Sequence, residues 1–313
     1  MRNKMNPMIK YRGGKHKEIA HFVNHMPKEY SIYIEPFFGG GALYFYLQPE
    51  RAIINDVNSR LYIFYKEMQE KYPEARVQLD KLQNIYEENQ GAYELLKKKH
   101  PDDRVENKNE ELYYLMRDAF NHKITVEYLE SVIYFFINKT SYSGMIRYNS
   151  AGEYNVPFGR YRNFNTKLIT EEHYKLLKRT DIYNYDYSKI FDLANQDDFI
   201  FLDPPYDCVF SDYGNEDYRE GFGEKEHRRL ADDFRNLSCK TLLVIGKTPL
   251  TEELYREFIV EEYDISYAVN IRNRFEASCQ IEEGNGEGRI LWRAVGYSAF
   301  RIGYLYEYGR TVI

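Results

Sequence analysis

The feature that most constrains the fold is a strand, a glycine-rich turn, a helix and a second strand, which read SIYIEPF, FGGG, ALYFYL and RAIIND within residues 31–56. This order predicts the first β-α-β unit of an α/β domain. Glycines directly after a strand let the backbone approach a ligand closely, and a nucleoside cofactor is a common one. Asp56, 15 residues after Gly41, suits the two hydroxyls of a ribose. A glycine turn in any α/β protein explains the segment equally well.

The α/β pattern is interrupted and then resumes. From residue 59 to about 139 the sequence predicts helices, one of them in TVEYLESVIYFFINK with Thr125 as its N-cap, and a polar break over residues 97–111. Strands are predicted again in TDIYNYDY, DDFIFLDPPY and CKTLLVIGK, with a helix around EKEHRRLADDFRNL. The expected division is a domain of residues 1–60 and 168–313 with a mostly helical domain inserted at residues 61–167.

The last part of the predicted insert differs in composition from the helical part before it. Residues 140–166 are rich in Gly, Asn, Ser, Tyr and Arg and show little periodicity. They are typical of a loop or a hairpin, with a turn at Asn149–Gly152. Because a long ordered loop in a compact protein is more often functional than not, we expect this segment to carry part of the function.

A second strong constraint is the sequence DPPY, Asp203 to Tyr206, directly after the apolar strand FIFL. Two prolines end the strand ladder and fix a rigid turn. The turn presents one carboxylate, a backbone carbonyl without a local donor, and one aromatic ring. These groups can accept hydrogen bonds from a planar exocyclic amine and stack on its ring. The alternative is a rigid loop capped by a tyrosine.

Charge is spread unevenly along the chain. The net charge is −6, from 43 Lys and Arg against 49 Asp and Glu. Residues 1–17 carry +6 and residues 139–167 carry +4, which leaves −16 for the rest. Two basic segments on an acidic body could form a local anion-binding face. Charge alone favours the alternative of two solvated faces with counter-charges folded onto them.

Several classes of protein are excluded or disfavoured. No apolar run approaches the ~20 residues of a membrane span, and the basic N-terminus lacks the apolar segment of a secretory signal. Three scattered cysteines, Cys208, Cys239 and Cys279, without a CxxC motif indicate a reducing cytosolic compartment. HFVNH lacks the Glu of HExxH, and no clustered His, Cys and carboxylate set occurs, so we expect no metal. The glycine turn is not GxGxxG, which disfavours a dinucleotide enzyme.

Four segments in one order resemble the Dam-type (D12 class, α-group) site-specific DNA adenine-N6 methyltransferases. The family order is K-[WY]-x-G-G-K, a glycine motif after EPF, a target-recognition region and DPPY. The matching segments are Lys10–Lys15, Glu35–Gly41, the insert and Asp203–Tyr206. NKTSYSGMIRYNSAGEYNVPFGRY also resembles the family's DNA-contacting hairpin, here residues 139–163. The resemblance covers about residues 8–245 and implies a Rossmann-like methyltransferase fold, dependent on S-adenosylmethionine (SAM), with an inserted target-recognition domain.

The resemblance also implies the role of individual residues. The cofactor would be SAM and the partner double-stranded DNA, with no obligate protein partner, in the cytoplasm of a bacterium or of a phage-infected host. The catalytic residues would be Asp203, Pro204 and Tyr206. The cofactor-binding residues would be Tyr11, Lys15, Phe37, Gly39, Asp56, Asp186, Tyr187 and Asp203. The DNA-binding residues would be Lys10, Lys139, Tyr142, Ser143, Met145, Arg147, Asn155, Pro157 and Arg160.

The implied reaction is methyl transfer from SAM to the N6 amine of an adenine flipped out of a short duplex site. Arg147 matches the family's base-reading arginine, which permits GATC as that site, and Tyr142 matches an aromatic wedge. The sequence departs from the family pattern at Ser143, which replaces an Asn, and at Lys139, which replaces an Arg. Two alternatives remain: a methyltransferase acting on cytosine N4 or RNA, and a DNA-binding homologue without activity.

Overall fold

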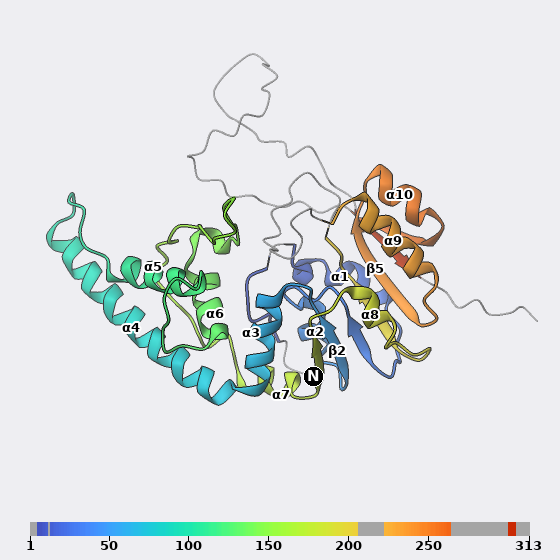
Figure 1. Cartoon of the computed structure of the whole chain (residues 1–313), viewed down its shortest axis with the longest axis horizontal. Helices are drawn as coiled ribbons and strands as arrows, with labels where there is room; N and C mark the ends of the chain where they lie inside the picture. Colours follow the sequence, from blue (N-terminus) through green and yellow to red (C-terminus); the bar gives the residue numbers. More distant parts are fainter. Residues whose placement is uncertain (1–4, 12, 206–221, 264–299, 305–313) are drawn as a thin grey trace, which may run out of the picture.

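A seven-stranded sheet forms the centre of the fold, in the order β3-β2-β1-β4-β5-β7-β6 (Figure 1). The computed structural model describes residues 5–11, 13–205 and 222–263 and the backbone of residues 300–304, so Tyr206 lies outside the described residues. The strands are β1 (Tyr33–Glu35), β2 (Ala52–Asn55), β3 (Thr180–Tyr183), β4 (Phe199–Leu202), β5 (Lys240–Gly246), β6 (Ile259–Tyr263) and β7 (Phe300–Tyr304). Strands β3, β2, β1, β4 and β5 run parallel, whereas β7 is antiparallel to both β5 and β6. The five parallel strands confirm the expected Rossmann-like α/β fold.

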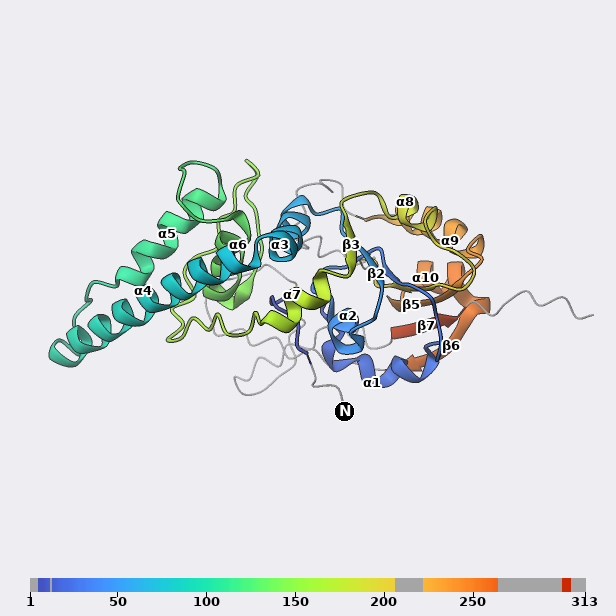
Figure 2. The same cartoon turned by 90° about the horizontal axis from the view of Figure 1, so that it is seen from below.

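Helices cover both faces of the sheet. The helices are α1 (Ile19–Phe22), α2 (Ala42–Leu47), α3 (Ser59–Glu70), α4 (Tyr72–Lys99), α5 (Lys108–Phe120), α6 (Glu130–Thr140), α7 (Glu171–Leu177), α8 (Tyr187–Phe191), α9 (Glu224–Arg235) and α10 (Pro249–Tyr255). Short 3-10 helices lie at Lys15–Lys17, Val23–His25, Tyr142–Gly144 and Arg256–Phe258. Figure 2 shows α1 and α2 on one face of the sheet and α8 and α9 on the other.

The central strands are apolar because both of their faces are buried. In β4, Phe199 and Phe201 belong to one buried cluster, whereas Ile200 and Leu202 belong to the cluster on the opposite face. Strands β1, β2 and β5 show the same alternation. A parallel strand covered by helices on both sides gains from apolar residues at every position, which explains the uninterrupted FIFL run.

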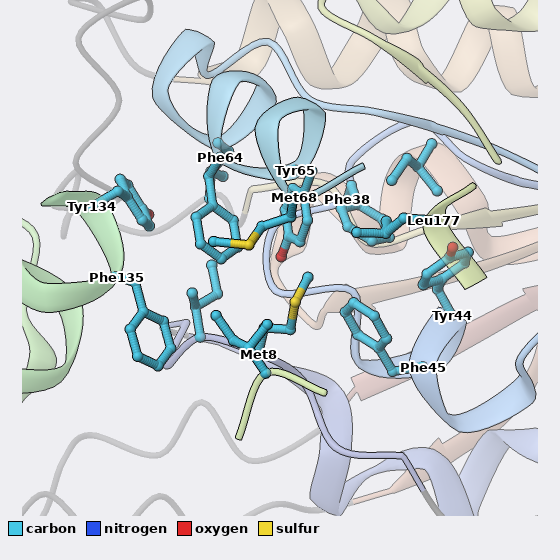
Figure 3. Close-up of a cluster of buried hydrophobic side chains, with 14 of the residues drawn as sticks. Met8, Phe38, Tyr44, Phe45, Phe64, Tyr65, Met68, Tyr134, Phe135 and Leu177 are labelled. Carbon is cyan, nitrogen blue, oxygen red and sulfur yellow. The ribbon is translucent and has the colours of Figure 1, made fainter. Parts of the chain in front are cut away.

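The helical insert shares the core of the sheet domain. Phe38, in the glycine turn, packs on Tyr65 of α3 with ring centroids 4.7 Å apart. Phe64 continues the contact to Tyr134 of α6, with centroids 5.4 Å apart. These rings and Phe135 belong to one continuous buried cluster, which Figure 3 shows running from the sheet side into the insert. Burial of these rings therefore fixes the insert against the sheet.

Helix α6 begins later than the sequence predicts. Its N-cap is Leu129, and residues 125–129 are not helical, so the assignment of Thr125 as N-cap is wrong. The N–H of Leu129 donates to Oε1 of Gln78 at 2.8 Å, and the N–H of Ser131 donates to Oε2 of Glu67 at 2.9 Å. Side chains of α3 and α4 therefore accept from two N–H groups at the start of α6, where the N-cap residue itself provides no side-chain cap.

Helix α4 is the longest helix of the described chain, with 28 residues, and it extends the insert away from the sheet (Figure 1). Its buried residues form a single stripe of Ala75, Leu79, Leu82 and Tyr86. It ends at Lys99 and α5 begins at Lys108, so the polar break is shorter than expected. Within the described residues, no helix is long and apolar enough to cross a membrane.

We expect Phe135→Ala to lower the free energy of unfolding by about 3–5 kcal/mol, because the ring is fully buried in the shared core. Urea unfolding followed by far-UV and near-UV circular dichroism measures the change. Both signals should lose their native values in one transition, since the insert and the sheet share the cluster. Val77→Ala, at a 69% exposed position on α4, is the control and should stay within about 0.5 kcal/mol. Two separate transitions, only one of them shifted by Phe135→Ala, would contradict the shared core.

Candidate active site and nucleic-acid interface

The two chemistry-bearing segments meet at one edge of the sheet. Strands β1 and β4 are parallel neighbours. The strand that follows β1 in the chain, β2, lies on one side of this pair, and the strand that follows β4, β5, lies on the other side. A crevice forms at the carboxyl ends of two such strands, and ligands of open α/β sheets bind there. Strand β1 ends at Glu35 and β4 ends at Leu202, directly before Asp203. The EPF and DPPY segments therefore face the same crevice.

An ion pair links the N-terminal motif to the DPPY turn. Nζ of Lys15 lies 2.6 Å from Oδ1 of Asp203 and also donates to the carbonyl of Gly13 at 3.1 Å. The Lys15 side chain is only 2% exposed, whereas that of Asp203 is 21% exposed. A charge-assisted hydrogen bond of this length fixes the orientation of the carboxylate. Asp203 is held on one side by Lys15 and is still reachable from solvent.

Glu35 is a candidate site residue that the sequence analysis missed. It ends β1, is 3% exposed, and accepts a hydrogen bond from the hydroxyl of Tyr33 at 2.8 Å. Burial raises the pKa of this carboxyl well above its usual range, and the nearby charges of Asp203 and Asp56 raise it further, against the opposing hydrogen bond of Tyr33. Its position in EPF was the available signal. Glu35 therefore favours its neutral form beside Asp203 and Asp56, with Lys15 as a nearby cation.

The glycine turn lies against Tyr11. A Cβ added at Gly39, whose φ is +48°, would lie 2.6 Å from the ring of Tyr11, and one at Gly40 would lie 2.8 Å from its Cβ. The sequence analysis explained these glycines by the approach of a ligand, and the structure adds a second reason, the close contact of Tyr11. The N-terminal motif and the glycine turn therefore form one unit.

Asp56 is held in place by backbone donors. Its Oδ2 accepts from the N–H of Gly39 at 2.8 Å, and its Oδ1 accepts from the N–H of Asn58 at 2.9 Å. The structure thus brings Asp56 to the glycine turn, as a ribose-binding carboxylate requires.

Asp186 makes protein contacts with both oxygens. Arg229 approaches them at 2.6 and 2.7 Å, and Oδ1 also caps α8 through the N–H of Ser188. The ring of the buried Tyr187 lies 5.2 Å from that of Phe37, and its hydroxyl donates to Asp233 at 2.9 Å. The expected adenine partner is therefore fixed by Arg229, beside an aromatic pair.

Asn55 fixes the loop that carries Asp186 and was also missed by the sequence analysis. Its Oδ1 accepts from the N–H of Tyr185 at 2.8 Å, and its Nδ2 donates to the carbonyls of Tyr185 and Pro36 at 3.0 and 2.9 Å. Asn55 is 1% exposed. One buried amide thus joins the loop after β3 to the loop after β1.

Residues 141–158 form an irregular hairpin. Antiparallel bridges join Ser141 to Phe158 and Tyr148 to Tyr154. The N–H of Gly152 donates to the carbonyl of Asn149 at 2.9 Å, which confirms the predicted turn. The hairpin lies beside α6 and rises above it (Figure 1).

Exposed side chains of several types gather on this hairpin. Nε of Arg147 donates to Oδ1 of Asn155 at 3.0 Å, and Tyr142 is 43% exposed. Ser143 and Pro157 are also exposed, whereas Met145 is half-buried and its carbonyl accepts from the hydroxyl of Tyr154. The expected DNA-binding residues of the hairpin therefore share one segment.

Acidic side chains lie near two arginines of the basic segment of residues 139–167. Arg160 lies 3.5 Å from Glu110, and Arg162 lies 3.0 Å from Glu94. The alternative of folded counter-charges thus applies to these two arginines. Both pairs are exposed, so we expect each to contribute little stability and to open readily for another anion.

Lys10 and Lys139 lie close together at the base of the hairpin. Burial lowers the pKa of Lys139 to about 8, with a further contribution from the charge of Lys10. Burial likewise lowers the pKa of Lys10, whose Nζ lies 4.6 Å from the ring centre of Tyr161. Two neighbouring cations that are partly shielded from water favour the binding of an anion such as a phosphate.

The two histidines of HFVNH contact β6. Nε2 of His25 lies 2.5 Å from Oε2 of Glu261, and the ring of His21 stacks on Tyr263 with centroids 4.4 Å apart. Within the part of the chain that the structure describes, no group of three His, Cys, Asp or Glu side chains is placed to hold a metal ion.

Comparison with known proteins agrees with this geometry. The chain matches the model of the D12 class N6 adenine-specific DNA methyltransferases over residues 11–270. It is 35% identical over 273 residues to the Type II methyltransferase M.CviBI of Paramecium bursaria Chlorella virus NC1A, covering 86% of this chain and 94% of that protein. It is 33% identical over 280 residues to the Type II methyltransferase M1.LlaDCHI of Lactococcus lactis subsp. cremoris, covering 84% and 89%. It is 28% identical over 264 residues to the DNA adenine methylase of Haemophilus influenzae, covering 80% and 83%.

The family match extends from Tyr11, in the N-terminal motif, through the glycine turn, the insert and the DPPY turn to residue 270. It therefore includes both strands of the crevice and the whole hairpin. The chain belongs to the D12 class of N6 adenine-specific DNA methyltransferases and is a site-specific, adenine-specific DNA methyltransferase.

Proposed function

We propose that the protein transfers the methyl group of SAM to the N6 amine of an adenine flipped out of a short double-stranded DNA site, with GATC as the first candidate sequence. The observation that carries the proposal is the Lys15–Asp203 ion pair at the carboxyl ends of β1 and β4. It leaves a fixed, partly exposed carboxylate at the place where α/β folds bind nucleosides.

The side chains at this edge fit a cationic nucleoside. Asp56 and Asp203 supply two carboxylates against the ammonium group of Lys15, whereas burial favours the neutral form of Glu35 between them. SAM carries a sulfonium and an ammonium group, so a net negative edge favours its binding. Asp56 would accept hydrogen bonds from the ribose hydroxyls, and its backbone contacts hold it in position for this.

Aromatic rings would line the rest of the cofactor site. Phe37 and Tyr187 would contact the adenine of SAM, with Asp186 oriented by Arg229 beside them. Tyr11 lies against the glycine turn that follows β1. Faces of aromatic rings also stabilise a nearby sulfonium charge.

Catalysis would rest on positioning. The adenine amine is a poor nucleophile because its lone pair is delocalised into the ring. Asp203 and the carbonyl of Pro204 would accept hydrogen bonds from its two hydrogens, which draws the nitrogen toward tetrahedral geometry. Lys15 keeps the Asp203 carboxylate in that orientation, and Tyr206 would stack on the flipped base. When bound, SAM would supply an electrophilic methyl group: the N–C bond would form as the C–S bond breaks, SAH would depart, and one N6 proton would pass by way of Asp203 to solvent.

DNA would bind over the hairpin, and the helical domain of residues 61–167 would be the target-recognition domain. Arg147 would read a base edge, and Tyr142 would fill the gap left in the stack by the flipped base. Lys10, Lys139 and Arg160 would contact phosphates, with Ser143, Met145, Asn155 and Pro157 shaping the rest of the surface.

Asp203→Asn tests the proposed chemistry. We expect kcat to fall by at least ~100-fold, because the amide cannot accept from the amine in the same way and places an N–H near it. The assay follows transfer of tritiated methyl from SAM to duplex DNA and identifies the modified base by chromatography, while sequencing of the DNA gives the site. DNA binding should persist in the variant, whereas binding of S-adenosylhomocysteine (SAH) should weaken, because Asp203 also holds the buried Lys15 of the N-terminal motif in place. Retained turnover, or label on RNA or cytosine N4 in the wild type, would contradict the proposal.

Arg147→Ala tests base reading. We expect a loss of about 1–3 kcal/mol in transition-state binding at one base pair, with relaxed specificity there, because a side chain that reads a base discriminates at that position. The measurement is kcat/KM on duplexes substituted at each position of the site. Arg162→Ala, a charge removal at an exposed position of the same segment, should weaken binding to all sequences equally. An equal loss on every duplex for Arg147→Ala would mean a phosphate contact instead.

Lys139 gives the DNA affinity a specific pH dependence. In the free protein its pKa is about 8, and contact with a phosphate favours the charged form, so binding takes up a proton above pH 8. The affinity should therefore be constant below about pH 7 and fall as the pH rises through 8, by up to about tenfold per pH unit. Fluorescence anisotropy of a labelled duplex from pH 6.5 to 9.5 measures this. Lys139→Arg, charged throughout, should lack the fall, and parallel profiles for both proteins would remove Lys139 from the interface.

A further inference from the structure

A buried asparagine joins the N-terminal motif to the recognition side of the molecule. Oδ1 of Asn138 accepts from the backbone N–H of Lys10 at 2.8 Å, and its Nδ2 donates to the backbone carbonyl of Lys10 at 2.7 Å. Asn138 is 1% exposed and lies in the last turn of α6. The amide pairs with Lys10 as a neighbouring strand would, although the two residues are 128 positions apart.

On the cofactor side, the residue after Lys10 contacts the glycine turn. Tyr11 follows Lys10, and its ring fills the space beside Gly39 and Gly40. The N–H of Gly39 in turn donates to Asp56, the proposed ribose ligand. A shift of the Lys10 backbone therefore moves the ring that packs on this turn.

On the DNA side, Asn138 is two residues from the end of α6, where the hairpin begins. The carbonyl of Thr140 accepts from the N–H of Gly159 at 2.8 Å, so the returning strand of the hairpin is anchored at the same place. Gly144, with a φ of +63°, provides a second contact, because a Cβ there would lie 2.9 Å from Cδ of Lys10 and 3.2 Å from the carbonyl oxygen of Asn138. The base of the hairpin and Lys10 thus move together.

The chain offers a matched comparison in Asn121. Its Oδ1 accepts from the N–H of Tyr154 at 2.8 Å, and its Nδ2 donates to the carbonyl of Tyr154 at 3.0 Å. This is the same reciprocal pairing, but it holds the returning arm of the hairpin to the end of α5 and, among the described residues, makes no hydrogen bond to the N-terminal motif. A comparison of variants at these two asparagines therefore distinguishes a loss of hairpin stability from a loss of the link to the cofactor site.

We propose that Asn138 is a positioning residue that couples DNA binding at the hairpin to SAM binding at the glycine turn. Hairpin movement on DNA is transmitted through the Asn138 amide to the Lys10 backbone, and from there through Tyr11 to Gly39. The proposal rests on the proposed sites for SAM and DNA. By linkage, each ligand then raises the affinity of the other by the same factor, typically about 5–150-fold.

The test measures this factor directly in the full chain. Calorimetry gives the Kd of SAH without DNA and with a saturating duplex that the wild-type protein methylates. In the wild type we expect DNA to tighten SAH binding by at least about fivefold. In Asn138→Ala the factor should fall to within twofold of one, while SAH and DNA each still bind. Asn121→Ala should weaken DNA binding and keep the wild-type factor.

Asn138→Asp keeps the proposal testable if the alanine variant does not fold. It has the same shape and keeps the acceptor for the N–H of Lys10, but it places an oxygen against the Lys10 carbonyl in place of the donor, so the factor should fall here also. A factor of one in the wild type, an unchanged factor in the Asn138 variants, or an equal fall in Asn121→Ala would overturn the coupling role. Failure of the wild type to bind SAH at all would instead overturn the proposed function.

Discussion

Lys15 and Asp203 are 188 residues apart in the sequence, and the geometry of the site depends on the ion pair between them. A buried ammonium group without a partner destabilises a fold by several kcal/mol, so Lys15 at 2% exposure requires Asp203. The N-terminal motif must therefore close over the carboxyl ends of β1 and β4. This closure places Tyr11 on the glycine turn and Lys10 at the hairpin, so one contact organises segments from four parts of the chain.

The segments that carry the proposed site are loops, and their backbone groups need partners that no strand supplies. In the described residues, asparagine side chains fill this role at three places: the buried Asn55 pairs with Tyr185, the buried Asn138 with Lys10, and the half-buried Asn121 with Tyr154. An amide has one acceptor and one donor side, so it can hold a peptide unit as a strand would. Unlike an added strand, it holds the loop at a single residue and leaves the neighbouring positions to face a ligand.

The sequence predicts the α/β framework well because the strands are short apolar runs and the motifs lie at their ends. Asp56 and Asp203 could be assigned to the crevice for that reason. The contacts of Gln78 and Glu67 at the start of α6 could not be predicted, because both acceptor side chains come from other helices. The ion pair of Asp186 with Arg229 and the hydrogen bonds of Asn138 with Lys10 join residues that are far apart in the sequence, so no local pattern predicts them. Counter-charges on Arg160 and Arg162 depend on the fold in the same way.

The two proposed ligands have opposite charges, and the N-terminal motif spans the boundary between the surfaces that suit them. Lys15 lies with Asp56 and Asp203 at an acidic edge that suits a sulfonium nucleoside. Lys10, five residues earlier, lies with Lys139 at a basic hairpin base that suits a phosphate. The net charge of −6 for the whole chain therefore does not reveal that the two proposed sites differ in sign. An anion at Lys10 and a cation beside Lys15 attract each other across this short segment. Electrostatics would therefore favour simultaneous binding of DNA and SAM, as the proposed coupling through the Asn138–Lys10 hydrogen bonds does.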